Sequence, residues 1–160
     1  MSRSRRATVT AAFAIAAVLA GPGSALPAHA ATCNGATCNN LDPHDAGCDT
    51  DKNIKNLDDR TANNVRYVLR YSPACDAAWV KYSFINRGPG AGDISVQKKV
   101  KPPYRDAYWA TVSTESTAYN DSGWTNMVGG NAANTVVVRG KLYTQGGAAT
   151  GYYYTNEAPI

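Results

Sequence analysis

Residues 65–71 have the sequence VRYVLRY, in which every second side chain is apolar or aromatic. Two of the three side chains between them are arginines, Arg66 and Arg70. Successive side chains of a β-strand point to opposite faces of a sheet, so this two-residue period predicts a strand with one buried and one solvated face. Ser72 and Pro73 follow directly and predict a turn.

The same alternation recurs along the rest of the chain. Apolar and polar side chains alternate over residues 78–84, up to the turn-forming sequence NRGPG at 86–90. Further short strands, separated by Gly-, Pro- and Asn-rich segments, are predicted at residues 94–96, 108–112, 124–128, 135–143 and 151–155. No segment after residue 30 shows the 3.6-residue apolar period of a helix. The pattern predicts an all-β fold, a small antiparallel barrel or sandwich of about seven strands.

The first 30 residues have the composition of a secretory signal peptide. Three arginines in residues 3–6 precede an apolar run at 11–20, and the small residues Ala28 and Ala30, on either side of His29, precede a predicted cleavage point after Ala30. The apolar run is shorter than the roughly 20 residues that a bilayer crossing needs. We therefore expect a secreted, extracellular protein with no membrane association after signal removal. Residues 31–64 and 65–160 are expected to be the loop segment and the β body of one domain.

Four cysteines, Cys33, Cys38, Cys48 and Cys75, lie in or just beyond the loop segment. An even number in an exported chain predicts disulfides rather than a zinc site, because oxidised sulfur offers no thiolate to the metal. Four cysteines allow three pairings, and the sequence does not select one. The preferred pairing is Cys33 with Cys38 and Cys48 with Cys75, which ties the loop segment to the β body.

The charge of the chain argues against nucleic acid as a partner. Three of the sixteen basic residues and none of the twelve acidic ones lie in the predicted signal peptide, so the remaining chain has a net charge of 13 − 12 = +1. This small excess is not the strongly basic footprint of a nucleic-acid-binding domain. A monomer is expected.

His44 is the one histidine after the predicted signal peptide. With Asp42 or Asp45 it supplies the base and the orienting acid of a Ser-His-Asp arrangement. The chain contains no G-x-S-x-G nucleophile turn, however. The favoured interpretation is a histidine that is bonded locally within a polar loop.

Carboxylates are the other candidate catalytic or metal-binding groups. Residues 49–53 begin like a calcium-binding loop, but Ile54 and Arg60 replace the glycine and the bidentate acid that such a loop requires. We interpret these aspartates as turn formers and leave calcium binding open. Glu115 and Glu157, the only glutamates, are candidates for the paired acids of a glycosidase.

Ten tyrosines and three tryptophans all lie after residue 30. In a strand at 151–155, Tyr152 and Tyr154 share one face and Tyr153 lies on the other. Exposed rings of this kind can stack on sugar rings. The favoured interpretation is that most of the aromatic side chains form the core and its rim, with a binding platform as the alternative.

The segment LRYSPACDAAW, residues 69–79, resembles the most recognisable stretch of a secreted family of Gram-positive bacteria, especially actinomycetes, that is catalogued as domain of unknown function 2690. Cys33, Cys38 and Cys48 resemble its opening cysteine pattern, and WTNMV at 124–128 resembles a later element. The resemblance implies an extracytoplasmic location. It also implies sensing or binding, because related domains lie outside the membrane behind cytoplasmic DNA-binding regulators.

We expect a secreted protein of unknown biochemical activity that acts as a non-enzymatic extracellular binding module. The expected partner is cell-wall glycan, another polymer or a protein. The alternative is a small secreted hydrolase that uses carboxylates or His44. No catalytic residue, cofactor or metal site is assigned.

Overall fold

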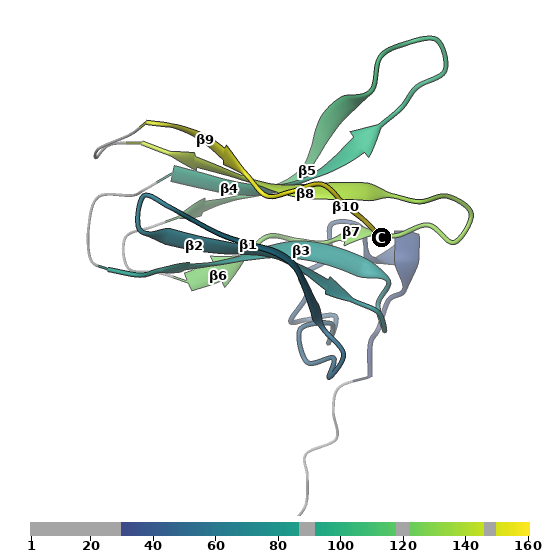
Figure 1. Cartoon of the computed structure of the whole chain (residues 1–160). Helices are drawn as coiled ribbons and strands as arrows, with labels where there is room; N and C mark the ends of the chain where they lie inside the picture. Colours follow the sequence, from purple (N-terminus) through teal and green to yellow (C-terminus); the bar gives the residue numbers. More distant parts are fainter. Residues whose placement is uncertain (1–29, 87–91, 118–121, 146–149) are drawn as a thin grey trace, which may run out of the picture.

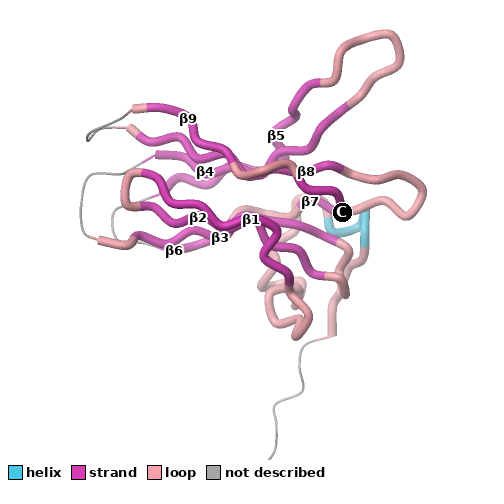
Figure 2. Tube along the Cα trace, in the orientation of Figure 1, coloured by secondary structure: helices cyan, strands magenta, loops and turns pink. Residues whose placement is uncertain are grey.

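The computed structural model describes residues 30–86, 92–117, 122–145 and 150–160. Two antiparallel sheets face each other, and their strands are connected by turns and loops (Figures 1 and 2). The fold is therefore all-β, as predicted, and it is a sandwich rather than a closed barrel. The predicted signal peptide, apart from Ala30, and residues 87–90 of the NRGPG turn lie outside the described residues.

The first sheet has the strand order β1-β2-β3-β6, and β7 also pairs with β3. Its strands are β1 (Lys55–Ala62), β2 (Val65–Ser72), β3 (Ala77–Phe84), β6 (Ser122–Trp124) and β7 (Val128–Gly129). The second sheet has the order β10-β8-β4-β5, and β9 also pairs with β8. Its strands are β4 (Gly92–Val100), β5 (Tyr108–Thr117), β8 (Val137–Thr144), β9 (Gly151–Tyr154) and β10 (Ala158–Pro159).

The main core fills the space between the two sheets. Its fully or almost fully buried side chains come from alternate positions of β2, β3, β4 and β8, as the two-residue period predicts. They include Val65, Tyr67, Leu69, Ala78, Val80, Ile94, Val96, Val138 and Leu142. Arg139, Lys141 and Tyr143 alternate with the buried positions of β8 and are only partly buried. The alternation of this strand therefore places Val138 and Leu142 in the core and Arg139, Lys141 and Tyr143 on the opposite face.

The expectation that residues 31–64 form a loop was wrong for residues 55–62, which form β1, and for the short 3-10 helix η1 (Gly35–Cys38). The predicted strand at 124–128 is also divided. β6 ends at Trp124, and Thr125 instead bonds β3: its amide donates to the Val80 carbonyl (3.0 Å) and its hydroxyl accepts from the Val80 amide (3.1 Å). The described residues contain ten strands, seven of which have four or more residues.

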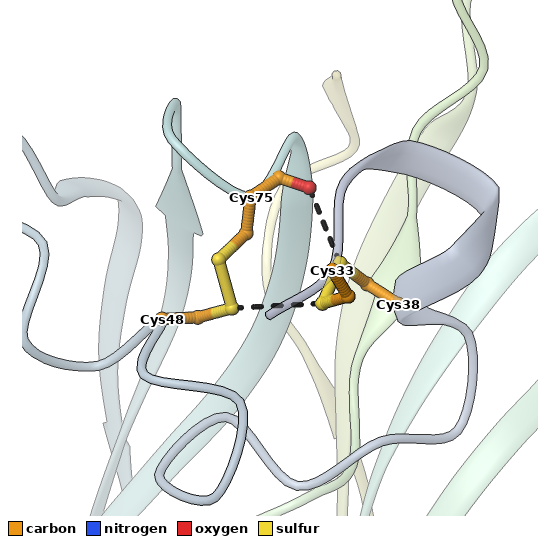
Figure 3. A group of neighbouring side chains, drawn as sticks. All are labelled: Cys33, Cys38, Cys48 and Cys75. Atoms are coloured by element: carbon orange, nitrogen blue, oxygen red, sulfur yellow. Dashed lines mark hydrogen bonds between the residues drawn. A yellow bond between two sulfur atoms is a disulfide. The ribbon is translucent and has the colours of Figure 1, made fainter. Parts of the chain in front are cut away.

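Residues 31–54, which precede β1, cover the outer face of β3 and are held there by the two disulfides. We call them the disulfide-tied segment. The bridges join Cys33 with Cys38 and Cys48 with Cys75, which confirms the preferred pairing (Figure 3). The two bridges touch, since the sulfurs of Cys33 and Cys48 lie 3.9 Å apart. Together with Ala46, Ala77, Trp79 and Met127 the cysteines form a second buried cluster. The domain therefore has two cores, one on each side of β3.

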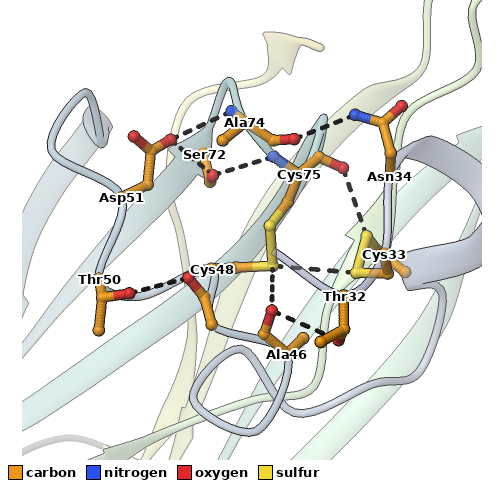
Figure 4. Close-up of a disulfide and its surroundings, with 12 residues drawn as sticks. Thr32, Cys33, Asn34, Ala46, Cys48, Thr50, Asp51, Ser72, Ala74 and Cys75 are labelled. Carbon is orange, nitrogen blue, oxygen red and sulfur yellow. Dashed lines mark hydrogen bonds between the residues drawn. A yellow bond between two sulfur atoms is a disulfide. The ribbon is translucent and has the colours of Figure 1, made fainter. Parts of the chain in front are cut away.

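Asp51 fastens this segment to the turn between β2 and β3 (Figure 4). Its carboxylate accepts hydrogen bonds from the Ser72 hydroxyl (2.7 Å), the Ala74 amide (3.1 Å) and the Asn53 amide (2.8 Å). These bonds, first of all the one from Asn53, hold the pKa of Asp51 below its usual value. The Cys48–Cys75 bridge lies beside the same turn.

The β4–β5 hairpin extends beyond the sandwich. Figure 1 shows its tip, residues 101–107, standing out from the second sheet on the side away from the first. The pairing of β4 with β5 changes register between Val96 and Gln97, and such a bulge bends a strand pair. The hairpin thus rises beside the outer face of the second sheet. Within the described residues, the structure contains no helix with the length and apolar character needed to cross a membrane.

Candidate functional site

The outer face of the second sheet carries exposed aromatic side chains next to basic ones. We call this surface the aromatic face and define it by Trp109, Arg139, Lys141, Tyr143, Tyr152 and Tyr154. The rings of Tyr143 and Tyr152, directly opposite each other on β8 and β9, have centroids 4.9 Å apart. Tyr152 is 57% exposed and Tyr154 42% exposed, whereas Tyr153 packs against the core. The predicted division of the three tyrosines between two faces is confirmed.

Cation–π contacts hold the rings in place. The Arg139 guanidinium lies 4.1 Å from the Trp109 ring centroid and 4.3 Å from that of Tyr154, so from β8 it contacts β9 on one side and reaches across β4 to β5 on the other. Its Nε also donates to Oε1 of Gln97 (2.9 Å). Lys141 lies 4.1 Å from the centroid of Tyr152. Such contacts contribute roughly 0.5–2 kcal/mol each and reduce the mobility of the side chains before a ligand arrives.

A hollow of about 320 Å³ lies beside these rings. Its walls combine aromatic rings with hydroxyl, carboxylate and ammonium groups from four adjacent strands: Asp93, Ser95, Thr111, Thr114, Lys141, Tyr143 and Tyr152. The lining is mainly polar, and the rings of Tyr143 and Tyr152 supply its aromatic part. The arrangement offers both a stacking surface and hydrogen-bond partners to a hydroxyl-rich ligand.

Charge on this face is mainly positive. Lys99 is paired with Glu157 (2.9 Å), while Arg139 and Lys141 contact rings rather than carboxylates. Partial burial beneath two rings lowers the pKa of Arg139 from its usual value. A guanidinium nevertheless stays charged at every ordinary pH.

His44 lies on the disulfide-tied segment, away from the aromatic face. Its Nδ1 lies 3.0 Å from Oδ2 of Asp49, and the side chain is 63% exposed. The bond to Asp49, together with the charge of that carboxylate, raises the pKa of His44 from 6.5. Asp49 rather than Asp42 or Asp45 is thus the acid partner. Among the described residues, no hydroxyl forms a hydrogen bond with the His44 ring, whose side-chain partner is Asp49.

The remaining acidic candidates serve the local structure. One Asp42 oxygen accepts from the amides of His44 (2.7 Å) and Asp45 (3.2 Å), and the other accepts from Trp124 Nε1 (2.9 Å). Asp42 and Asp51 thus accept hydrogen bonds from backbone amides two or three residues further along the chain, which agrees with the interpretation of Asp51 as a turn former.

Glu115 and Glu157 lie on opposite sides of the second sheet. Glu115 pairs directly with the buried Ile94 and so shares its inward side, while Glu157 bonds Lys99 on the outer side. The two glutamates therefore do not face each other across the hollow. The four cysteine sulfurs lie within 4.8 Å of one another but are all bonded in disulfides.

Sequence reasoning missed the polar half of the aromatic face. Asp93, Ser95, Thr111 and Arg139 come together because β4 pairs with β5 on one side and with β8 on the other, and no local pattern reveals that order. The alternation in residues 137–144 signals that Arg139 and Lys141 point outward, but not which rings they meet.

The fold and its outer face define a disulfide-capped β-sandwich with an aromatic sheet surface. The family described as "Protein of unknown function (DUF2690)" matches residues 36–158. The chain belongs to this family, which confirms the resemblance; the matched residues include Cys38, Cys48 and the LRYSPAC segment, and Cys33 precedes them. Comparisons with curated proteins and with solved structures find no match.

Proposed function

We propose that this chain is a secreted, non-enzymatic binding module that holds an extracellular glycan on its aromatic face. The observation that carries the proposal is the pair of exposed tyrosines, Tyr152 and Tyr154, held over Lys141 and Arg139 beside a polar hollow. A sugar ring has an apolar C–H face and a rim of hydroxyl groups. The tyrosine rings can stack on the apolar C–H face. Asp93, Ser95 and Thr114 can form hydrogen bonds with the hydroxyl groups.

The test compares retention on purified bacterial cell wall. The parent protein is expected to sediment with the wall at moderate salt, and the double variant Tyr152→Ala/Tyr154→Ala is expected to bind about tenfold more weakly, since each lost ring contact contributes roughly 0.5–1.5 kcal/mol. Tyr104→Ala is the control, because Tyr104 is fully exposed on the β4–β5 hairpin outside the face. Equal retention of the parent and the double variant would overturn the assignment of the face.

Secretion is the second part of the proposal. Two disulfides are typical of proteins that mature outside the reducing cytoplasm, and the first 30 residues have the composition of a signal peptide. The protein recovered from culture medium is expected to begin at Ala31 on N-terminal sequencing. Recovery of the chain in the cytoplasm with an uncleaved N-terminus would contradict this part.

A further inference from the structure

A second hollow lies on the outer face of the first sheet, on the opposite side of the sandwich from the aromatic face. Its volume is about 180 Å³, and its walls are Asn56, Arg66, Val68, Arg70, Lys81, Tyr82 and Ser83. Strand register explains the three cations. Val68 on β2 lies directly opposite Lys81 on β3, and Arg66 and Arg70 lie two positions to either side of Val68. All three basic side chains therefore point outward around one apolar residue.

Within the part of the chain that the structure describes, only Arg66 among these three cations has a carboxylate partner. Arg66 makes a two-nitrogen ion pair with Asp59 of β1. Arg70 and Lys81 make no ion pair within the described residues, and no acidic side chain lines the hollow. Within the described residues, Arg70 and Lys81 are therefore two cations without an ion-pair partner, and the rest of the lining comprises Arg66, Asn56, Val68, Tyr82 and Ser83.

Arg70 is also held in position. Its guanidinium lies 5.7 Å from the ring centroid of Trp79, the residue directly opposite it on β3, and Trp79 is itself buried in the second core. A guanidinium that is partly buried and stacked loses less conformational freedom on binding than a free surface side chain.

We propose that Arg70 and Lys81 form a binding site for a phosphate-type oxyanion. The hollow is rich in donors, with five N–H groups on Arg70, three on Lys81 and an amide on Asn56. A tetrahedral phosphate accepts from several directions at once, and the planar fork of arginine fits two of its oxygens. The same chemistry recognises free inorganic phosphate and the phosphodiester groups of an extracellular glycopolymer. The site is one compact hollow and not the extended basic stripe that binds nucleic acid.

The test is a titration of the ¹⁵N-labelled secreted protein with inorganic phosphate, with sodium chloride at matched ionic strength as the reference. We expect the Nε–H resonance of Arg70 to shift with phosphate in a saturable manner. The double variant Arg70→Gln/Lys81→Gln is expected to weaken the affinity at least tenfold. Arg105→Gln, on the β4–β5 hairpin, is the matched control and is expected to leave the affinity unchanged.

A second arm distinguishes the two sources of phosphate. The probe is poly(glycerol phosphate). Tighter binding per phosphate than that of the free ion indicates a polymer ligand, and equal affinity per phosphate indicates the free anion. Both results support the site. An identical response to phosphate and chloride, or unchanged phosphate affinity in the folded double variant, overturns it. Tyr152→Ala/Tyr154→Ala is expected to leave the titration unchanged, so a failure of the aromatic face is distinguished from a failure of this site.

Discussion

Gly129 lies where the chain passes closest to the disulfide-tied segment. A Cβ atom at this position would lie 1.9 Å from the carbonyl oxygen of Gly35 and 2.6 Å from its carbonyl carbon. Both are backbone atoms that no side-chain rotation can move. The backbone of Gly129 is also held in place, because its amide donates a hydrogen bond to Oδ1 of Asn39 (3.1 Å).

Gly129→Ala is therefore expected to destabilise the domain by about 1–3 kcal/mol, the usual cost of overpacking. Gly151→Ala is the control, since a Cβ atom there meets nothing within 4 Å, and its effect is expected to stay within about 0.5 kcal/mol. Urea unfolding followed by tryptophan fluorescence measures both. Equal stabilities of the two variants would show that the close approach of Gly129 to Gly35 is relieved at no cost.

Asp51 is a second residue whose role can be isolated. Asp51→Ala removes three hydrogen bonds to a carboxylate, and a loss of about 1–3 kcal/mol is expected because the Ser72 hydroxyl and the Ala74 amide lose their partner. Asp106→Ala, on the exposed hairpin tip, is the control for the loss of an acidic side chain.

The effect of Asp51 is expected to depend on pH. Its pKa is lower in the folded state than the usual 3.8, so its contribution is fully present above 3.8 and is lost as the pH falls through the folded-state value. The difference in unfolding free energy between the parent and Asp51→Ala should therefore shrink in strong acid. A difference that grows in acid would contradict this assignment.

At the scale of elements, the two disulfides constrain loops of different length. The chain-entropy model assigns roughly 3 to 3.5 kcal/mol to Cys48–Cys75 and about 2 kcal/mol to Cys33–Cys38. Cys48→Ala/Cys75→Ala is therefore expected to lower the unfolding free energy more than Cys33→Ala/Cys38→Ala. It also frees the segment that covers Trp79, so the tryptophan fluorescence of the folded state should change. The reverse order of stabilities would show that native packing, and not loop closure, decides which bridge contributes more to the unfolding free energy.

β2 and β3 were predictable because their alternation reflects a sheet with one face in the main core. β1 was not predictable in this way, because it is an edge strand and, of its residues, only Leu57 and Ala62 pack against that core. A register shift between Asn56 and Asp58 further breaks the two-residue period. Tyr152 and Tyr154 were predictable from the alternation of β9 alone, whereas the hollow beside them depends on strand order, which is set by non-local pairing.

At the scale of the whole molecule, the edge strand of the first sheet, β1, bears on whether copies of the chain associate. β1 carries Lys55, Asp58, Asp59 and Arg60, and charged edge strands resist pairing with a second copy. We expect a monomer at micromolar concentration by size-exclusion chromatography with light scattering. Lys55→Val/Arg60→Val is expected to promote association by removing two of these charges. A parent protein that elutes as a dimer would contradict the expectation.

The contact between the two bridges has a consequence for making this protein. All four sulfurs lie within 4.8 Å of one another, so a thiolate formed at any cysteine lies within attacking range of a sulfur in the other bridge. Thiol–disulfide exchange then shuffles the bonds among the three pairings. Chains expressed in a reducing cytosol and oxidised after folding are therefore expected to include isomers with other pairings. Homogeneous material requires oxidation during folding, and the cysteines must be blocked in acid, where thiolates are scarce, before their linkage is mapped.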